Sequence, residues 1–319
     1  MRAIDAEATR RHLPFGALID ALRQRFGEGN AGSTGCEVPQ RHTHAIGHDG
    51  TLLLMPAWRA GARLGLKTVG IFPGNTLLGL PALHSTYLLF DARTGVPLAS
   101  IDGNEITSRR TAAASALAAS YLARADARSL LIVGAGRVAA LLAAAMRAVR
   151  PIARVQVWNH RAASAEQLAA QLREQGIAAR ACTDLRSAVQ QADIVSCATL
   201  STTALIHGAW LRPGTHLDLV GSFTPAMHEA DAACFARSSV FIDTAEALAK
   251  SGDLLQAKAA GAFADAHLCA TLAGLCSGAH AGRASATECT LFKAVGTALE
   301  DLTAAELVFD AVAAGESLC

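Results

Sequence analysis

The stretch that decides the fold is SLLIVGAGRVAALLAAAMRAV, residues 129–149. Its apolar start, 129–133, has the length and composition of a buried strand, and an alanine-rich helical run follows directly. Between them, Gly134 permits a tight turn and Gly136 lets the backbone approach a pyrophosphate, while the small Ala139 allows the helix to pack on the sheet. The helix N-terminus would add N–H donors for the anion. The sequence therefore predicts a dinucleotide site formed by Gly134, Ala135, Gly136, Arg137 and Val138.

The next strand-like run is RVQVW at 154–158. In a dinucleotide site the residues that follow this strand contact the ribose. Asn159 lies 25 positions after Gly134, about where an NAD enzyme carries an acid for the ribose 2′-hydroxyl. Here the acid is absent. Asn159 can still hydrogen-bond a ribose, and Arg161, after His160, can pair with a 2′-phosphate, so NADPH is favoured over NADH. The alternative for Arg161 is a solvated loop charge.

The pattern of expected helices and strands changes near residue 125. The length of the chain is that of two ordinary domains. Before that point we expect a helix and a meander of strands, and after it strands and helices alternate, which predicts a parallel, doubly wound sheet. A long helix at 106–124 links the two halves, and another is expected at 285–314. The remaining expected helices are 15–26, 138–147, 163–175 and 185–191, and the expected strands are 41–46, 51–58, 64–72, 85–90, 96–101, 129–133, 154–158, 178–181, 194–197, 215–220 and 240–242.

The composition indicates which kinds of molecule the protein can bind. Of the 319 residues 51% are hydrophobic and 17% charged, and 28 Lys and Arg against 27 Asp and Glu give a net charge of +1. Such a chain has no basic field for a nucleic acid or an anionic membrane, so we expect a small-molecule partner. Glycines interrupt its most apolar stretch, which argues against a membrane span. The N-terminus has no apolar signal segment and the eight cysteines form no CxxC pair, so a cytoplasmic protein is expected.

A metal site is not expected. His42, His44 and His48 lie close together in the sequence, and the first two would share one face of a strand. A metal site there would need Cys or carboxylate partners that the sequence does not single out.

Several further motifs, spread over nearly the whole chain, point to one family. They are LKTV at 66–69 with FPGN at 72–75 and GLP at 79–81, DGNEITSRRTAA at 102–113, GAGRVA at 134–139, VGSFTP at 220–225 and TLFKAVG at 290–296. In this order they resemble the ornithine cyclodeaminase/mu-crystallin family. The resemblance implies a homodimer of α/β fold, with a Rossmann doubly wound parallel sheet, the NAD(P)-binding domain at 116–289, inserted in an α+β domain. That second domain, 1–115 plus 290–319, would bind substrate and form the dimer.

The resemblance also implies a carboxylate pocket with three cations. Arg41 and Arg110 match the two arginines that bind the substrate carboxylate, and a planar guanidinium suits bidentate binding. Lys67 matches the family lysine; beside two guanidiniums its pKa should be lowered, which suits proton transfer. Arg109 is the alternative to Arg110, because neighbours on a helix point about 100° apart and only one can face a pocket. Only 17% of the residues are charged, so three cations in one small pocket would give that pocket an unusually high positive charge.

Two departures from the family pattern bear on the reaction. Phe223 stands where ornithine cyclodeaminase and the family's alanine dehydrogenase carry an aspartate that handles a substrate amino group, and Ala82 stands where cyclodeaminases have threonine. Phenylalanine cannot accept a proton. The resemblance therefore favours an NAD(P)H-dependent reductase of cyclic ketimines, an oxidoreductase that would form proline or pipecolate. The alternatives are an ornithine cyclodeaminase and a non-catalytic protein that binds NADPH and a small ligand.

The remaining candidates are less specific. Ala198, Thr199, Val220 and Gly221 follow strand-like runs, where doubly wound folds bind ligands, and would contact the cofactor; Thr199 could instead cap a helix. The family motifs add Thr111 and Val295 to the cofactor set, although packing alone also explains Val295 and Lys293. His84, near Ala82, would line the substrate pocket together with Phe223.

Overall fold

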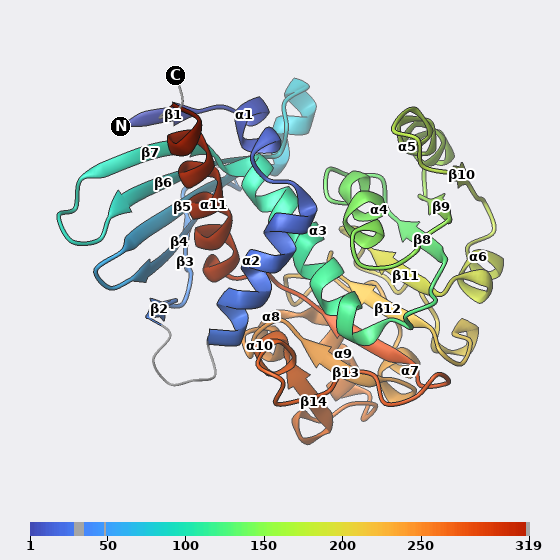
Figure 1. The fold of residues 1–319 in the computed structure, drawn as a ribbon. Coiled ribbons are helices and arrows are strands. Elements are labelled where there is room, and N and C mark those ends of the chain that lie inside the picture. The colour runs from blue at the N-terminus through green and yellow to red at the C-terminus, as the bar shows by residue number, and fades with distance from the viewer. Residues whose placement is uncertain (29–34, 48, 317–319) are drawn as a thin grey trace. The chain divides into compact units, whose positions relative to one another are not determined.

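The computed structural model describes residues 1–28, 35–47 and 49–316, and these fall into two compact units (Figure 1). Unit 1 comprises Met1–Arg110 and the chain from Thr297 onward, and unit 2 comprises Thr111–Gly296. Helix α3 (Gly103–Leu122) carries the chain into unit 2, and the segment after strand β15 (Thr290–Lys293) returns it to unit 1. The segment that forms unit 2 is therefore inserted in the sequence of unit 1.

Unit 1 is built on a seven-stranded sheet. Its path is β1-β7-β6-β5-β4-β2, with β3 also paired to β4, and every pairing is antiparallel except β1 with β7. Short turns join β4 to β5 and β6 to β7, as the meander pattern predicts. The elements are β1 (Arg2–Ile4), α1 (Ala6–Arg11), α2 (Phe15–Glu28), β2 (Cys36–Glu37), β3 (His42–Ala45), β4 (Thr51–Arg59), β5 (Arg63–Ile71), η1 (Pro73–Leu78), β6 (Leu83–Asp91), β7 (Pro97–Asp102) and α11 (Ala298–Glu316).

The two faces of this sheet differ in burial. Helices α2 and α11 pack together, and α11 lies across β4, β5 and β6 (Figure 1). The residues of β5 that face the helices, Gly65, Lys67 and Val69, are buried, and those between them are half-buried. Because side chains alternate along a strand, Lys67 points into the core of unit 1.

Unit 2 contains an eight-stranded sheet in which all pairings are parallel, in the order β10-β9-β8-β11-β12-β15-β13-β14. The strand order reverses between β8 and β11, the switch point of a doubly wound fold, and the predicted fold class is confirmed. The other elements are β8 (Ser129–Val133), α4 (Ala139–Arg147), β9 (Arg154–Trp158), α5 (Ala162–Glu174), β10 (Ala179–Ala181), α6 (Leu185–Gln191), β11 (Ile194–Cys197), η2 (Gly208–Trp210), β12 (His216–Leu219), α7 (Ala232–Ala236), β13 (Ser239–Ile242), α8 (Ala247–Lys250), α9 (Gly252–Ala259), η3 (Asp265–His267), β14 (Leu268–Thr271) and α10 (Leu272–Cys276).

The helix expected at 285–314 is wrong in its first part. Residues 290–293 form β15, which is fully buried and pairs with β12 on one side and β13 on the other. Gly296 has φ +77°, a left-handed conformation that separates this strand from α11. A run of only four residues, TLFK, does not reveal by periodicity whether it is strand or helix, so only its place in the sheet decides it. No helix in the described ranges is long and apolar enough to cross a membrane.

Candidate functional site

A lysine, an arginine and two carboxylates form a buried cluster within unit 1. Lys67 on β5 has only 1% of its surface exposed, and its Nζ lies 2.7 Å from Oδ2 of Asp301 on α11. Arg110 on α3, 6% exposed, donates from Nε to Oδ1 of Asp301 at 2.9 Å and from Nη1 to Oε2 of Glu300 at 2.6 Å. Asp301 thus joins the ammonium to the guanidinium.

The pKa of Lys67 is lowered to about 8, mainly because burial penalises the charged amine. The carboxylate of Asp301 acts in the opposite direction, and the positive charges of Arg110 and Arg41 lower the pKa of Lys67 further. The direction agrees with the sequence expectation, but burial is a larger cause than the neighbouring cations. An ammonium with a pKa near 8 is mostly protonated at neutral pH and still able to release its proton.

The three arginines named from the sequence take different positions. Arg41 lies just before β3, half-buried, where its charge acts on Lys67. Arg109 turns away from Arg110, donating from Nε to the carbonyl of Leu13 at 2.9 Å and stacking 4.6 Å from the ring centre of Phe15. The one-residue offset on α3 therefore leaves Arg110 as the member of the pair that joins Lys67.

The sequence pattern does not single out the two carboxylates, Glu300 and Asp301. Acidic residues in the first turn of a helix are common because they complement the helix dipole, and α11 begins with this pair. Both are fully buried. With them, the three cations leave a formal charge of +1, so the cluster departs less from neutrality than the sequence suggests. The one available signal was their position directly after the TLFKAVG motif.

His84 lies apart from this cluster. In the register of β5 and β6, Lys67 pairs with Tyr87 and Gly70 pairs with His84. Since side chains on a strand alternate between faces, His84 and Lys67 point to opposite faces of the sheet. A place for His84 in the substrate pocket stays a prediction, and within one chain its side chain faces away from that of Lys67. Ala82 is half-buried in the turn before β6.

In unit 2 the glycine-rich turn after β8 has the geometry that a dinucleotide requires. Gly134 has φ +117°, and a Cβ on it would lie 2.5 Å from the carbonyl oxygen of Ala198, so only glycine fits. Gly136 is exposed, and a Cβ there would meet nothing within 4 Å, which leaves open space beside the turn. Ala139 is fully buried as α4 begins. The residues present therefore fit a pyrophosphate, with Ala135, Arg137 and Val138 completing the turn.

The ribose-side candidates follow β9, the strand next to β8. Asn159 is half-buried and donates from Nδ2 to the carbonyl of Arg161 at 3.3 Å. His160 and Arg161 are exposed, and Arg161 stands at the N-cap position of α5 without a side-chain cap bond. Both side chains are thus at the carboxyl end of β9, on the edge of the sheet where doubly wound folds bind their ligands.

Two loops at the same edge are held by one buried carboxylate. Thr199 donates to Oε1 of Glu229 from its backbone N at 2.7 Å and from Oγ1 at 2.9 Å, and Gly221 donates from N to Oε2 at 2.7 Å. The chain after Thr199 is not helical, so the helix-cap alternative is wrong. Ala198 and Val220 precede these residues: the backbone N of Ala198 donates to the carbonyl of Val133 at the end of β8, and that of Val220 donates to the carbonyl of Cys197 at the end of β11. The sequence analysis does not single out Glu229, because it lies outside every motif quoted there.

The remaining cofactor candidates have contacts inside unit 2. The backbone N of Val295 donates to Oδ2 of Asp243 at 2.7 Å. Lys293 lies at the end of β15 rather than on a helix, fully buried, with Nζ 3.4 Å from Oδ2 of Asp253. Thr111 is half-buried on α3. Packing and hydrogen bonding inside unit 2 thus account for Lys293 and Val295.

Phe223, two residues after Gly221, is half-buried and packs against the hydrophobic core of unit 2. Its side chain offers no acceptor or charge to a ligand. The structure therefore has an apolar ring at the position where the family resemblance expects an aspartate in amine-releasing enzymes.

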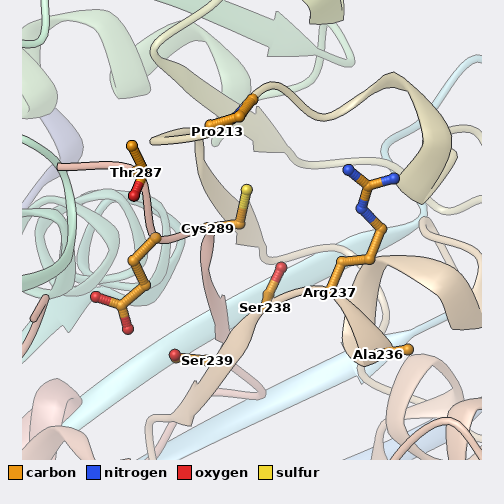
Figure 2. A pocket seen from close by; sticks show the side chains of 8 residues that line it. Pro213, Ala236, Arg237, Ser238, Ser239, Thr287 and Cys289 are labelled. Atoms are coloured by element: carbon orange, nitrogen blue, oxygen red, sulfur yellow. The ribbon is translucent and has the colours of Figure 1, made fainter. Parts of the chain in front are cut away.

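A surface pocket of about 440 Å³ lies away from this edge (Figure 2). It is lined by Pro213, Ala236, Arg237, Ser238, Ser239, Thr287, Glu288 and Cys289. These residues precede or begin β12, β13 and β15, so the pocket lies at the amino ends of parallel strands, opposite the edge with the glycine-rich turn. It is therefore separate from the dinucleotide site.

The histidines of β3 do not form part of a metal-binding group. The rings of His42 and His44 lie 6.4 Å apart edge to face, and His48 is outside the described residues. Within residues 1–28, 35–47 and 49–316, no three His, Cys, Asp or Glu side chains are arranged to hold a metal ion.

Comparisons with known proteins agree with the sequence resemblance. The chain is 44% identical over 263 residues to the Delta(1)-pyrroline-2-carboxylate reductase of Paracoccus denitrificans (strain Pd 1222), covering 81% of this chain and 83% of the relative. The structure of Thermococcus litoralis Delta(1)-pyrroline-2-carboxylate reductase in complex with NADH and L-proline matches with TM-score 0.93 and 32% identity, covering 99% of this chain and 98% of that one. An archaeal alanine dehydrogenase dimer with bound NAD matches with TM-score 0.92 and 26% identity, covering 99% and 97%. A model of the ornithine cyclodeaminase/mu-crystallin family matches residues 4–316, and the chain belongs to that family.

Proposed function

We propose that the protein is an NAD(P)H-dependent reductase of cyclic 2-carboxy imines, such as 1-pyrroline-2-carboxylate or 1-piperideine-2-carboxylate, and forms proline or pipecolate. The observation that carries the proposal is the buried ammonium of Lys67, which shares Asp301 with Arg110 and has a pKa of about 8. The relatives named for pyrroline-2-carboxylate reduction support it.

The cations divide the work of binding and proton transfer. The guanidiniums of Arg110 and Arg41 bind the substrate carboxylate, and Asp301 and Glu300 fix Arg110 in place. The ammonium of Lys67 gives a proton to the imine nitrogen, directly or through a water that it orients. A dinucleotide bound at the turn 134–138 would supply the hydride for the imine carbon, so that C=N would become CH–NH with oxidation of the cofactor. The turn at 134–138 holds its pyrophosphate.

Phe223 favours reduction over deamination. Release of ammonia from ornithine needs a group that accepts a proton from the substrate amine, and a phenyl ring cannot do this. Reduction of a preformed cyclic imine expels no amine, so it needs no carboxylate at this position.

NADPH is the favoured cofactor. No acid follows β9 to hold the ribose 2′-hydroxyl, and the exposed Arg161 offers its charge to a 2′-phosphate. The Michaelis constants for NADPH and NADH test this point: we expect a lower value for NADPH, and replacement of Arg161 by Ala should remove the difference. A clear preference of the unaltered protein for NADH would contradict the assignment.

The working form is a homodimer. The face of the unit 1 sheet away from α11 carries half-buried apolar residues, among them Pro56, Leu66 and Leu88. An apolar sheet face of this kind is normally covered, and the archaeal alanine dehydrogenase is described as a dimer. We propose that a second copy covers it, as the family resemblance implies. We also propose a cytoplasmic location, on the sequence features given above.

The decisive experiment follows NADPH absorbance with four amine or imine sources. We expect oxidation with pyrroline-2-carboxylate or piperideine-2-carboxylate and little with pyruvate plus ammonia or methylamine. Ornithine with NAD should release no ammonia. Formation of proline and ammonia from ornithine would establish a cyclodeaminase instead, and tight NADPH binding without any turnover would establish a binding protein.

The Lys67→Met variant tests the proton donor. Methionine has a similar volume and leaves Asp301 paired with Arg110, so the fold should persist. We expect imine reduction to fall by roughly 10²–10⁴-fold with unchanged NADPH affinity. Lys258→Ala is the matched control, since this lysine is ion-paired to Asp265 in unit 2. An undiminished rate in Lys67→Met would remove Lys67 from the mechanism.

A further inference from the structure

The backbone pairing of β11 and β12 ends just before the loops that carry Thr199 and Gly221. The last paired residues are Cys197 and Leu219. The backbone N of Val220 still donates to the carbonyl of Cys197 at 2.9 Å, but the N–H groups of Thr199 and Gly221 lie beyond the pairing. A buried N–H without an acceptor is costly. In this structure a single carboxylate, Glu229, accepts both.

The two loops are in backbone contact at this point. A Cβ on Gly221 would lie 1.9 Å from the carbonyl oxygen of Thr199 and 2.5 Å from Oε1 of Glu229. On the other side of Thr199, a Cβ on Gly134 would lie 2.5 Å from the carbonyl oxygen of Ala198. The glycine-rich turn, the loop after β11, the loop after β12 and the carboxylate therefore form one continuous layer along the carboxyl edge of the sheet.

Glu229 is itself anchored from the interior of unit 2. Oδ1 of Asp253 accepts from the backbone N of Glu229 at 2.7 Å and of Ala230 at 3.0 Å, and Oδ2 lies 3.4 Å from Nζ of Lys293. All three ionisable side chains are fully buried. Burial raises the pKa of Glu229 to about 7, although the charge of Lys293 and the bonds from Thr199 oppose this. Keeping such a group buried is costly, and an apolar residue would pack there at lower cost unless the loops needed an acceptor.

We propose that Glu229 is a positioning residue for the dinucleotide: by bonding Thr199 and Gly221 together it fixes the two loops next to the glycine-rich turn in the conformation that binds the cofactor. The inference rests on the proposed function for its ligand. It predicts an effect on cofactor affinity, with the proton chemistry of Lys67 left intact.

The Glu229→Gln variant tests the proposal by fluorescence titration with NADPH and by steady-state kinetics. The amide oxygen can still accept the two bonds from Thr199, but its NH₂ group faces the N–H of Gly221, so the third bond is lost. Since a hydrogen bond to a charged group contributes about 1.5–3 kcal/mol, we expect roughly tenfold or greater weakening of NADPH binding. The Michaelis constant for NADPH should rise, while kcat at saturating cofactor and the Michaelis constant for the imine stay near their original values.

Asp218→Asn is the matched control. Asp218 is a fully buried carboxylate on β12 that accepts from the hydroxyl of Ser196 at 2.5 Å and has no bond to either loop. Its replacement should lower thermal stability without changing NADPH affinity. Should Glu229→Gln not fold, Glu229→Asp retains the charge opposite Lys293 but is too short to reach both loops, and it should show the same weakening.

The outcomes separate this inference from the proposed function. If the unaltered protein binds no dinucleotide, the proposed function fails. If it binds NADPH and the Glu229 variants bind equally well within twofold, the positioning role is overturned. A parallel loss of affinity in Asp218→Asn would also overturn it, because the effect would then follow from general destabilisation.

Discussion

Asp301 is the residue that most directly controls the proton of Lys67. Its carboxylate lies 2.7 Å from the ammonium and raises the pKa of Lys67 against the effects of burial, Arg110 and Arg41. The sequence predicts the cations but not this partner. An arginine or lysine in a family motif is visible in the sequence, whereas an acid at the start of a helix looks ordinary until the helix is seen packed on β5.

The pH dependence of imine reduction follows from this pair. Because the ammonium is the proton donor, kcat/KM should fall as the pH rises through about 8, where Lys67 loses its proton. In Asp301→Asn the stabilising charge is gone, so the pKa of Lys67 drops and the fall should move to lower pH by roughly one unit. The measurement is a pH–rate profile with saturating NADPH.

Glu300→Gln provides the comparison for that profile. Glu300 contacts Arg110 through its carboxylate, whereas the ammonium of Lys67 is ion-paired to Asp301. Its replacement should weaken imine binding and leave the descending limb of the profile in place. An unmoved limb in Asp301→Asn would show that the titrating group is not Lys67.

Among the elements, the turn between β8 and α4 tests the dinucleotide geometry. Gly134→Ala places a Cβ 2.5 Å from the carbonyl oxygen of Ala198 at φ +117°, so we expect a loss of about 3 kcal/mol in the free energy of unfolding and much weaker NADPH binding. Gly176→Ala also has a positive φ, +75°, but open space around the new Cβ. It should cost about 1–2 kcal/mol and leave binding intact. Urea unfolding and NADPH titration measure both effects; equal behaviour of the two variants would contradict the steric argument.

Some helices and strands are predicted by the sequence patterns and others are not. The long α3 helix and strands β8, β9 and β11 are predicted within a few residues because each has a distinct period or a flanking turn. Strand β15 is not, since TLFK adjoins a helix and its strand character depends on the gap between β12 and β13. Short elements such as β1 and β14 are also missed, because they are stabilised by pairing with strands distant in sequence.

For the whole molecule, the open face of the unit 1 sheet leads to a prediction about assembly. Leu66 lies between Pro56 on β4 and Leu88 on β6 in the sheet register, at the centre of that face. Leu66→Glu would bury a charge if a second copy covers the face, so we expect dissociation to a folded monomer. Sedimentation velocity measures the mass. Val96→Glu, in the exposed turn before β7, should remain a dimer. A dimer that persists in Leu66→Glu would place the interface elsewhere.

At this scale the family resemblance, carried by motifs in a fixed order along the chain, implies an inserted Rossmann domain. The sequence does not predict which strand pairs complete the inserted sheet. Strands β12 and β13 both pair with β15 and not with each other, although β15 comes last in the chain.

That strand order has a consequence for how the protein is made. During synthesis, β13 and β14 emerge from the ribosome before β15, the strand that joins them to β12 in the finished sheet. Helix α11, which covers Lys67, emerges later still. Neither unit can therefore complete its core until the segment from Thr290 onward has left the ribosome, and a nascent chain stopped before it would expose unpaired strand edges prone to aggregation.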